Sequence, residues 1–71
     1  MTKLGLYLAA KSINKSEVSR KTGLTKARIN SLSMNSTSHL RAEELVLIAK
    51  AIGVDPSEML KDLYSHVKLK K

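Results

Sequence analysis

The stretch KSEVSRKTGLTKARINSL, residues 15–32, places one glycine between two segments in which apolar residues recur at helical spacing. Val18 lies on the expected buried side of the first segment, which Gly23 can end because glycine readily takes the left-handed conformation that follows a helix. Thr25 is a good N-cap for the second segment, since its hydroxyl can accept a free backbone N–H of the first turn. The stretch therefore predicts two short helices joined by a sharp turn.

The rest of the chain also has the pattern of helices, without alternating strands or a linker. The run Asp55-Pro56-Ser57-Glu58 is a strong helix start, because it combines an N-cap, a proline in the first turn and a glutamate that can bond back to the cap. We expect an all-α domain over residues 1–67 and a basic tail at 68–71. The expected helices cover residues 2–12, 15–22, 25–33, 43–52 and 56–67.

Positive charge is concentrated in one part of the chain. Thirteen Lys and Arg against six Asp and Glu give a net charge of +7 over 71 residues. Residues 1–41 hold eight basic groups and one acid, whereas residues 42–63 hold two basic groups and five acids. Such an asymmetric field attracts polyanions, and nucleic acid and anionic lipid are the two classes to consider.

Composition also limits the classes of function. The chain has no Cys and no apolar run longer than residues 45–49, so we expect no disulfide framework, no thiolate zinc site and no membrane partner. Two distant His residues make no metal site, and no serine has a positioned base beside it. We therefore expect no enzyme, no cofactor and no small-molecule ligand, and a cytoplasmic, nucleoid-associated location.

The free face of the expected helix 25–33 follows from helical geometry. If Ile29 is set at zero and each residue turns by about 100°, Leu32 lies at about 300° and the buried face centres near 330°. Ala27 and Ser31 then point away from the core, with a cation on each flank, while Asn30 is turned to the side. Short groups between cations suit insertion into the DNA major groove. The alternative is that any short solvent-facing helix is polar on its outside.

The quoted stretch resembles the helix-turn-helix of the phage-repressor and Cro-like (XRE) DNA-binding proteins, and the likeness covers residues 4–60. The downstream run ELVLIAKAIGVDPSEML looks like the fourth helix, the Gly-Val turn and the capped start of the fifth helix of that family. The resemblance implies a five-helix, lambda-repressor-like fold. It also implies a sequence-specific transcriptional regulator, most simply a repressor, that binds double-stranded DNA as a homodimer with helix 25–33 in the major groove.

The resemblance also implies which residues meet DNA. Lys15 stands where the family often has a Gln that touches a phosphate, and Arg28 occupies a position suited to phosphate. Residues 35–41 match a segment that follows the sugar-phosphate backbone. The full predicted set is Lys15, Ser16, Thr25, Lys26, Ala27, Arg28, Asn30, Ser31, Asn35, Ser36, Thr37, His39 and Arg41, with Tyr64 and Val67 as candidates for a dimer interface.

Departures from the family concern the contacts that hold the recognition helix, expected here at residues 25–33, against the rest of the domain. Members commonly pair an Arg late in the first helix with a Glu at the end of the recognition helix, followed two positions on by a Gly. Here Lys11, Ser33 and Asn35 stand at those places. We therefore expect apolar packing alone to hold the recognition helix, while Asn35 can still adopt the left-handed conformation that a Gly would supply. Ser19 replaces a usual Ala, and its hydroxyl can bond back to the preceding turn.

Two other functions are compatible with the same features. One is a protein-interaction module of the same fold, such as an antitoxin-like partner. The other is RNA binding, which we disfavour because the chain has only two aromatic residues, Tyr7 and Tyr64, on which bases could stack.

Overall fold

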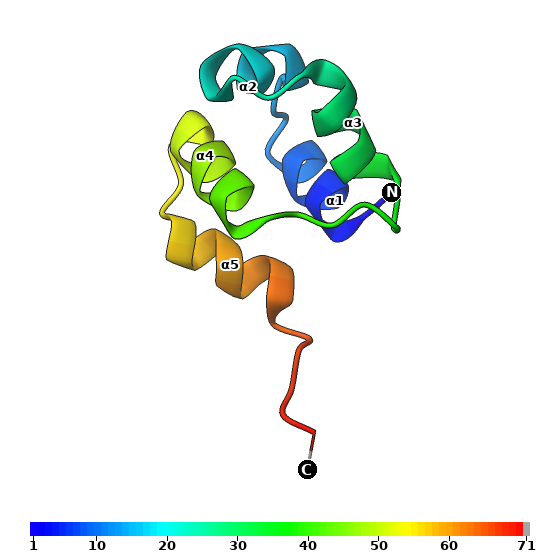
Figure 1. Ribbon diagram of the computed structural model, residues 1–71. Coiled ribbons are helices and arrows are strands. Elements are labelled where there is room, and N and C mark those ends of the chain that lie inside the picture. The colour runs from blue at the N-terminus through cyan, green and yellow to red at the C-terminus, as the bar shows by residue number, and fades with distance from the viewer. Residues whose placement is uncertain (71) are drawn as a thin grey trace.

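The computed structural model describes residues 1–70, and that part of the chain forms five helices (Figure 1). The predicted all-α, five-helix fold is confirmed, and Lys71 of the predicted tail lies outside the described residues. The helices are α1 (Lys3–Ala10), α2 (Lys15–Thr22), α3 (Lys26–Met34), α4 (Ala42–Ile52) and α5 (Pro56–Tyr64).

Two helices are shorter than predicted. Helix α1 ends at Ala10 rather than at residue 12, and Ser12 has a φ of 55°, a left-handed conformation that redirects the chain. Helix α5 ends at Tyr64 rather than at residue 67, and a turn follows in which the Val67 N–H donates to the Tyr64 carbonyl at 3.0 Å. The apolar spacing that suggested a longer α5 therefore continues into a segment that is no longer helical.

All five helices contribute apolar side chains to one core. Burying one large aliphatic side chain contributes about 1.5–3 kcal/mol, so each complete burial matters in a chain this short. Ile48 and Ala49 of α4 are fully buried, and Met59 fills the core from α5. The buried apolar set is Leu4, Leu8, Val18, Ile29, Leu32, Leu45, Ile48, Ala49, Met59 and Leu63.

Local signals in the sequence set the helix boundaries. The Asn14 side chain accepts from the N–H groups of Ser16 and Glu17 at 2.8 and 3.2 Å and so begins α2. The Thr25 hydroxyl accepts from the Arg28 N–H at 3.0 Å and begins α3. These side chains satisfy backbone donors that a helix leaves free at its start.

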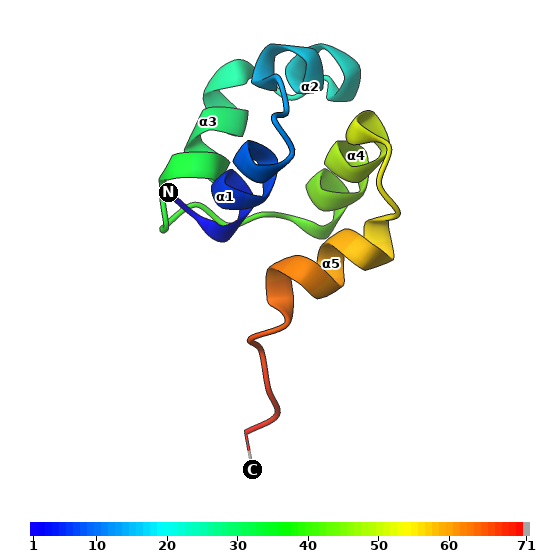
Figure 2. The same ribbon diagram turned by 180° about the vertical axis from the view of Figure 1, so that it is seen from behind.

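The helices are arranged so that α2 and α3 form one end of the molecule. Helix α5 lies at the opposite end, α1 and α4 lie between, and the chain after α5 extends away from the other helices (Figures 1 and 2). No helix within residues 1–70 combines the length and the apolarity needed to cross a membrane.

Candidate nucleic-acid interface

Hydrogen bonds on both sides of Gly23 hold the corner between α2 and α3. Gly23 has a φ of 82°, and its N–H donates to the Ser19 carbonyl at 3.0 Å. The Thr22 hydroxyl donates to the Val18 carbonyl at 2.7 Å and accepts from the Leu24 N–H at 3.1 Å. The Ser19 hydroxyl donates forward to the Leu24 carbonyl at 2.6 Å, and not back to its own preceding turn as the sequence suggested. These bonds fix where α3 starts relative to α2.

The C-terminal end of α3 is bound to the N-terminal end of α1 through Thr2. The Thr2 hydroxyl donates to the carbonyls of Leu32 and Ser33 at 2.7 and 2.9 Å, and its N–H donates to the Ser33 carbonyl at 2.9 Å. The same hydroxyl caps α1 by accepting from the Gly5 N–H at 3.1 Å. The expectation that apolar packing alone holds α3 was wrong, because free carbonyls at the end of one helix meet the cap of another.

Gly5 allows this close approach of α1 to α3. A Cβ atom at Gly5 would lie 2.2 Å from the Ser33 carbonyl oxygen, which is far inside van der Waals contact. Gly5 is buried, and the Ser33 side chain beside it is fully buried with its hydroxyl donating to the Ile29 carbonyl at 2.9 Å. The contact between α1 and α3 therefore requires a residue without a side chain at position 5, in addition to the hydrogen bonds of Thr2.

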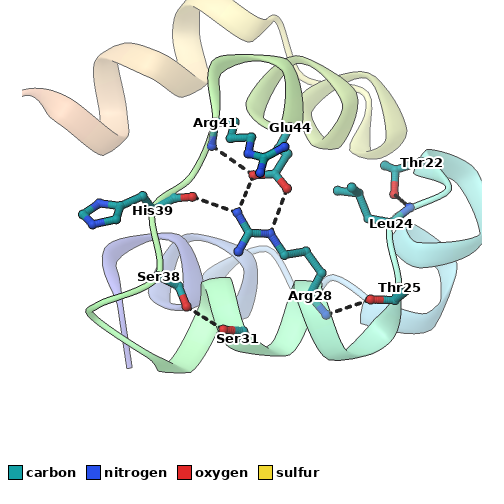
Figure 3. A network of polar contacts seen from close by, with 9 residues as sticks. All are labelled: Thr22, Leu24, Thr25, Arg28, Ser31, Ser38, His39, Arg41 and Glu44. Carbon is teal, nitrogen blue, oxygen red and sulfur yellow. Dashed lines mark hydrogen bonds and ion pairs between the residues drawn. The ribbon is translucent and has the colours of Figure 1, made fainter.

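A second tie, between Arg28 and Glu44, joins α3 to α4 (Figure 3). Arg28 Nε and Nη2 donate to the two Glu44 carboxylate oxygens at 2.8 and 2.9 Å. Nη2 also donates to the His39 carbonyl at 2.9 Å, and the Arg41 N–H donates to Glu44 at 3.0 Å. The guanidinium predicted to reach a phosphate is thus bonded within the protein, and it positions the loop that follows α3.

The ion pair has a defined effect on protonation. Glu44 is buried, and the hydrogen bond from Arg28 lowers the pKa of its carboxyl group, against the opposing effect of burial. The hydrogen bond from Glu44 in turn raises the pKa of the Arg28 guanidinium. Both groups are therefore charged at neutral pH. The sequence analysis did not predict Glu44 as the partner of Arg28. An acid in the first turn of the helix after α3 could have indicated it, because such a position favours a carboxylate.

The loop after α3 is folded onto the helix. The hydroxyl oxygens of Ser31 and Ser38 lie 2.5 Å apart and share a hydrogen bond. Asn35 has φ and ψ of −102° and 113°, so it does not adopt the left-handed conformation that the sequence allows there. Its side-chain oxygen instead accepts from the N–H and the hydroxyl of Thr37 at 2.9 and 2.7 Å, which forms a tight polar turn.

Most of the predicted DNA-contacting residues lie on the surface around α3. Met34 of α3 is also exposed, to 51%, and sequence reasoning did not include it although its helical position places it near Ala27. Arg20 forms an ion pair with Glu17 at the exposed edge of α2. Of the predicted set, the half-buried residues are Lys15, Arg28 and Ser31, and the exposed residues are Ser16, Thr25, Lys26, Ala27, Asn30, Asn35, Ser36, Thr37, His39 and Arg41.

The two dimer candidates lie at the opposite end of the fold from α2. Tyr64 is 39% exposed and Val67 is 63% exposed, and the Tyr64 ring stacks on His66 with 6.4 Å between ring centroids. Leu60, one helical turn before Tyr64, is 50% exposed. These residues form an apolar stripe along the outside of α5 and the turn that follows it.

Comparison with known proteins agrees with this geometry. A family model described as the Cro/C1-type HTH DNA-binding domain matches residues 3–63, a range that includes all five helices except the last residue of α5. Searches of curated proteins and of solved structures gave no significant match. The tight corner at Gly23, the outward-facing α3 and the match over most of its length together show that the chain belongs to the Cro/C1-type helix-turn-helix DNA-binding domain family.

Proposed function

We propose that this protein is a sequence-specific transcriptional regulator that inserts α3 into the major groove and represses by occupying its operator. The observation that carries the proposal is the exposed face of α3, where the short Ala27 side chain lies beside Lys26, directly after the corner held by the Thr22 and Ser19 hydroxyls. A short side chain lets the helix approach base edges, and a cation beside it can reach either a base or a phosphate. The protein would act in the cytoplasm, on the nucleoid.

The surface residues divide into two kinds of contact. Thr25, Lys26 and Ala27 are candidates for base edges or nearby backbone. Lys15 and Ser16, at the start of α2, are candidates for a phosphate. The loop residues Asn35, Ser36, Thr37, His39 and Arg41 would follow the backbone, and Arg28 would act by positioning that loop through Glu44 and His39 rather than by touching DNA.

We further propose that the protein binds as a symmetric dimer. A single domain of this size makes few phosphate contacts, so monomer binding should be weak and strongly salt-dependent. The exposed stripe of Leu60, Tyr64 and Val67 can pair with its own copy, and two α3 helices about 34 Å apart would then read a palindrome. Sedimentation with and without operator DNA tests this, and a monomer under both conditions at high concentration would contradict it.

Selection of bound sequences from a random duplex pool tests the main proposal. We expect an enriched, two-fold symmetric motif, and binding that weakens steeply as salt increases. Reversal of Lys15 and Lys26 to Glu should abolish retention at moderate salt. The matched control reverses Lys50 and Lys61, which are exposed cations of α4 and α5, and changes the net charge equally.

The same variants separate the proposal from its rival, a protein-interaction module. The exposed apolar stripe on α5 gives that rival its support, because such a surface can also receive another protein. If the fold serves a protein partner through α5, reversal of Lys15 and Lys26 should leave partner binding intact. If neither the natural chain nor the control retains any duplex at low ionic strength, the DNA-binding proposal fails.

A further inference from the structure

The surface of α3 that faces away from the core has two edges, which differ in whether their side chains are hydrogen-bonded within the protein. On one edge, Arg28 bonds to Glu44 and to the His39 carbonyl, and Ser31 shares a hydrogen bond with Ser38. Figure 3 shows both side chains directed toward the loop and α4. The Ser31 hydroxyl is therefore already engaged by the protein, and the loop lies beside it.

The other edge of α3 is open. Lys26, Ala27, Asn30 and Met34 are all exposed. With Ile29 at zero and about 100° per residue, they lie at about 60°, 160°, 100° and 140°, so Asn30 lies within the arc and not beside it. Within residues 1–70 the Asn30 side chain has no hydrogen-bond partner, in contrast to Arg28 and Ser31. The sequence interpretation included Asn30 among the DNA-contacting residues but turned it to the side, and it placed Ser31 near the centre of the free face; the hydrogen bond of Ser31 to the loop favours Asn30 for the central role.

We propose that Asn30 selects the base, and that the base is adenine. The amide of Asn carries a donor and an acceptor side by side, which match N7 and the N6 amino group of adenine in the major groove. The neighbouring Ala27 leaves room for so short a side chain to approach a base edge. This inference rests on the proposed function, because it requires α3 to enter the groove.

Parallel selections from a duplex pool with a randomised core test the inference. The natural chain should enrich an adenine at a fixed position of each half-site, preferred over other bases by about 5- to 150-fold. Asn30→Ala should lose that preference while it keeps the salt dependence of non-specific binding, because the amide neutralises no phosphate. Ser31→Ala is the matched control on the closed edge and should keep the adenine.

Asn30→Asp provides a second, nearly isosteric variant. A carboxylate only accepts hydrogen bonds, so the preferred base at that position should change from adenine to cytosine, whose N4 amino group donates. The inference is overturned if Asn30→Ala keeps the adenine, if Ser31→Ala loses it, or if Asn30→Asp retains the original base. Loss of all duplex binding by the natural chain would instead contradict the proposed function, so the two failures are distinguishable.

Discussion

The inner and outer sides of α3 are held by different kinds of interaction. On the inner side, Thr2 captures the last carbonyls of α3, and Gly5 allows the two helices to touch. On the outer side, Arg28 and Glu44 form an ion pair beside solvent, where the Arg28 side chain remains 32% exposed. The inner contact depends on shape and backbone bonds, and the outer contact depends on charge. The recognition helix therefore has one anchor without a titratable group and one that weakens in acid.

The largest expected effect comes from filling the inner contact. Gly5→Ala places a methyl group 2.2 Å from the Ser33 carbonyl oxygen, so α1 and α3 must separate and the Thr2 bonds must lengthen. We expect a loss of about 3 kcal/mol or more in the free energy of unfolding, at the upper end of overpacking effects. Urea denaturation followed by circular dichroism measures it.

The control for that substitution is Leu6→Ala on the exposed side of the same helix, where Leu6 is 59% exposed. Its free energy of unfolding should change by less than about 0.5 kcal/mol, as is usual for surface positions. If Gly5→Ala is as stable as this control, α1 and α3 do not meet as closely as the structure shows.

The outer contact should make stability sensitive to acid. The pKa of Glu44 is lower in the folded chain than its ordinary value of 4.5, so its contribution is complete above that value. It is lost as the pH falls through the folded pKa, since the unfolded chain then binds the proton more readily. Glu44→Gln should cost about 1.5–3 kcal/mol at pH 7, the range for hydrogen bonds to charged groups, and much less at pH 3.

Denaturation of both chains at pH 7 and pH 3 measures this difference. Glu43→Gln is the matched control, because Glu43 is an exposed neighbour in the same first turn of α4. It should lower stability only slightly, at either pH. An equal loss for Glu44→Gln at both pH values would show that the carboxylate charge is not what holds the outer side of α3.

Thr2→Val removes the hydrogen bonds of the Thr2 hydroxyl without adding bulk, and it leaves the bond from the residue 2 N–H to the Ser33 carbonyl in place. The isosteric methyl group can neither donate to the α3 carbonyls nor cap α1, so we expect a loss of about 1 kcal/mol, the usual cost of a missing N-cap. Unlike the Glu44 effect, this loss should be the same at pH 7 and pH 3. A loss that grows or vanishes between those pH values would contradict the assignment of the inner contact to uncharged groups.

The sequence predicted those parts of the structure that depend on neighbouring residues. The caps at Thr25 and Asp55 and the left-handed Gly23 are read within a few positions, and all three are observed. The two anchors of α3 could not be found in this way.

The reason is that both anchors join residues far apart in the chain. Thr2 bonds to a residue 31 positions away, and Arg28 to one 16 positions away, so neither pair shows any local pattern. The family resemblance could not supply them either, because Lys11 and Ser33 stand where members commonly form an Arg–Glu ion pair, and these two residues cannot make it. The true partners became visible only once the helices were packed.

The smallest expected effect tests whether the outer side also shapes the DNA-facing surface. Ser38→Ala removes the hydroxyl that bonds to Ser31, and one neutral hydrogen bond at a half-buried site contributes about 0.5–1 kcal/mol. Stability should therefore fall only slightly, because the bonds from Arg28 to Glu44 and His39 still hold the loop. The Ser31 hydroxyl, however, becomes free to turn toward the groove.

We expect the Ser38→Ala variant to keep its adenine preference at Asn30 and to accept additional bases at an adjacent position, since a serine can bond to several bases. Duplex selection with this variant measures the change, and Ser36→Ala, on an exposed loop residue, is the control. An unchanged motif would mean that the hydrogen bond between Ser31 and Ser38 stabilises the loop without limiting which side chains of α3 reach the bases.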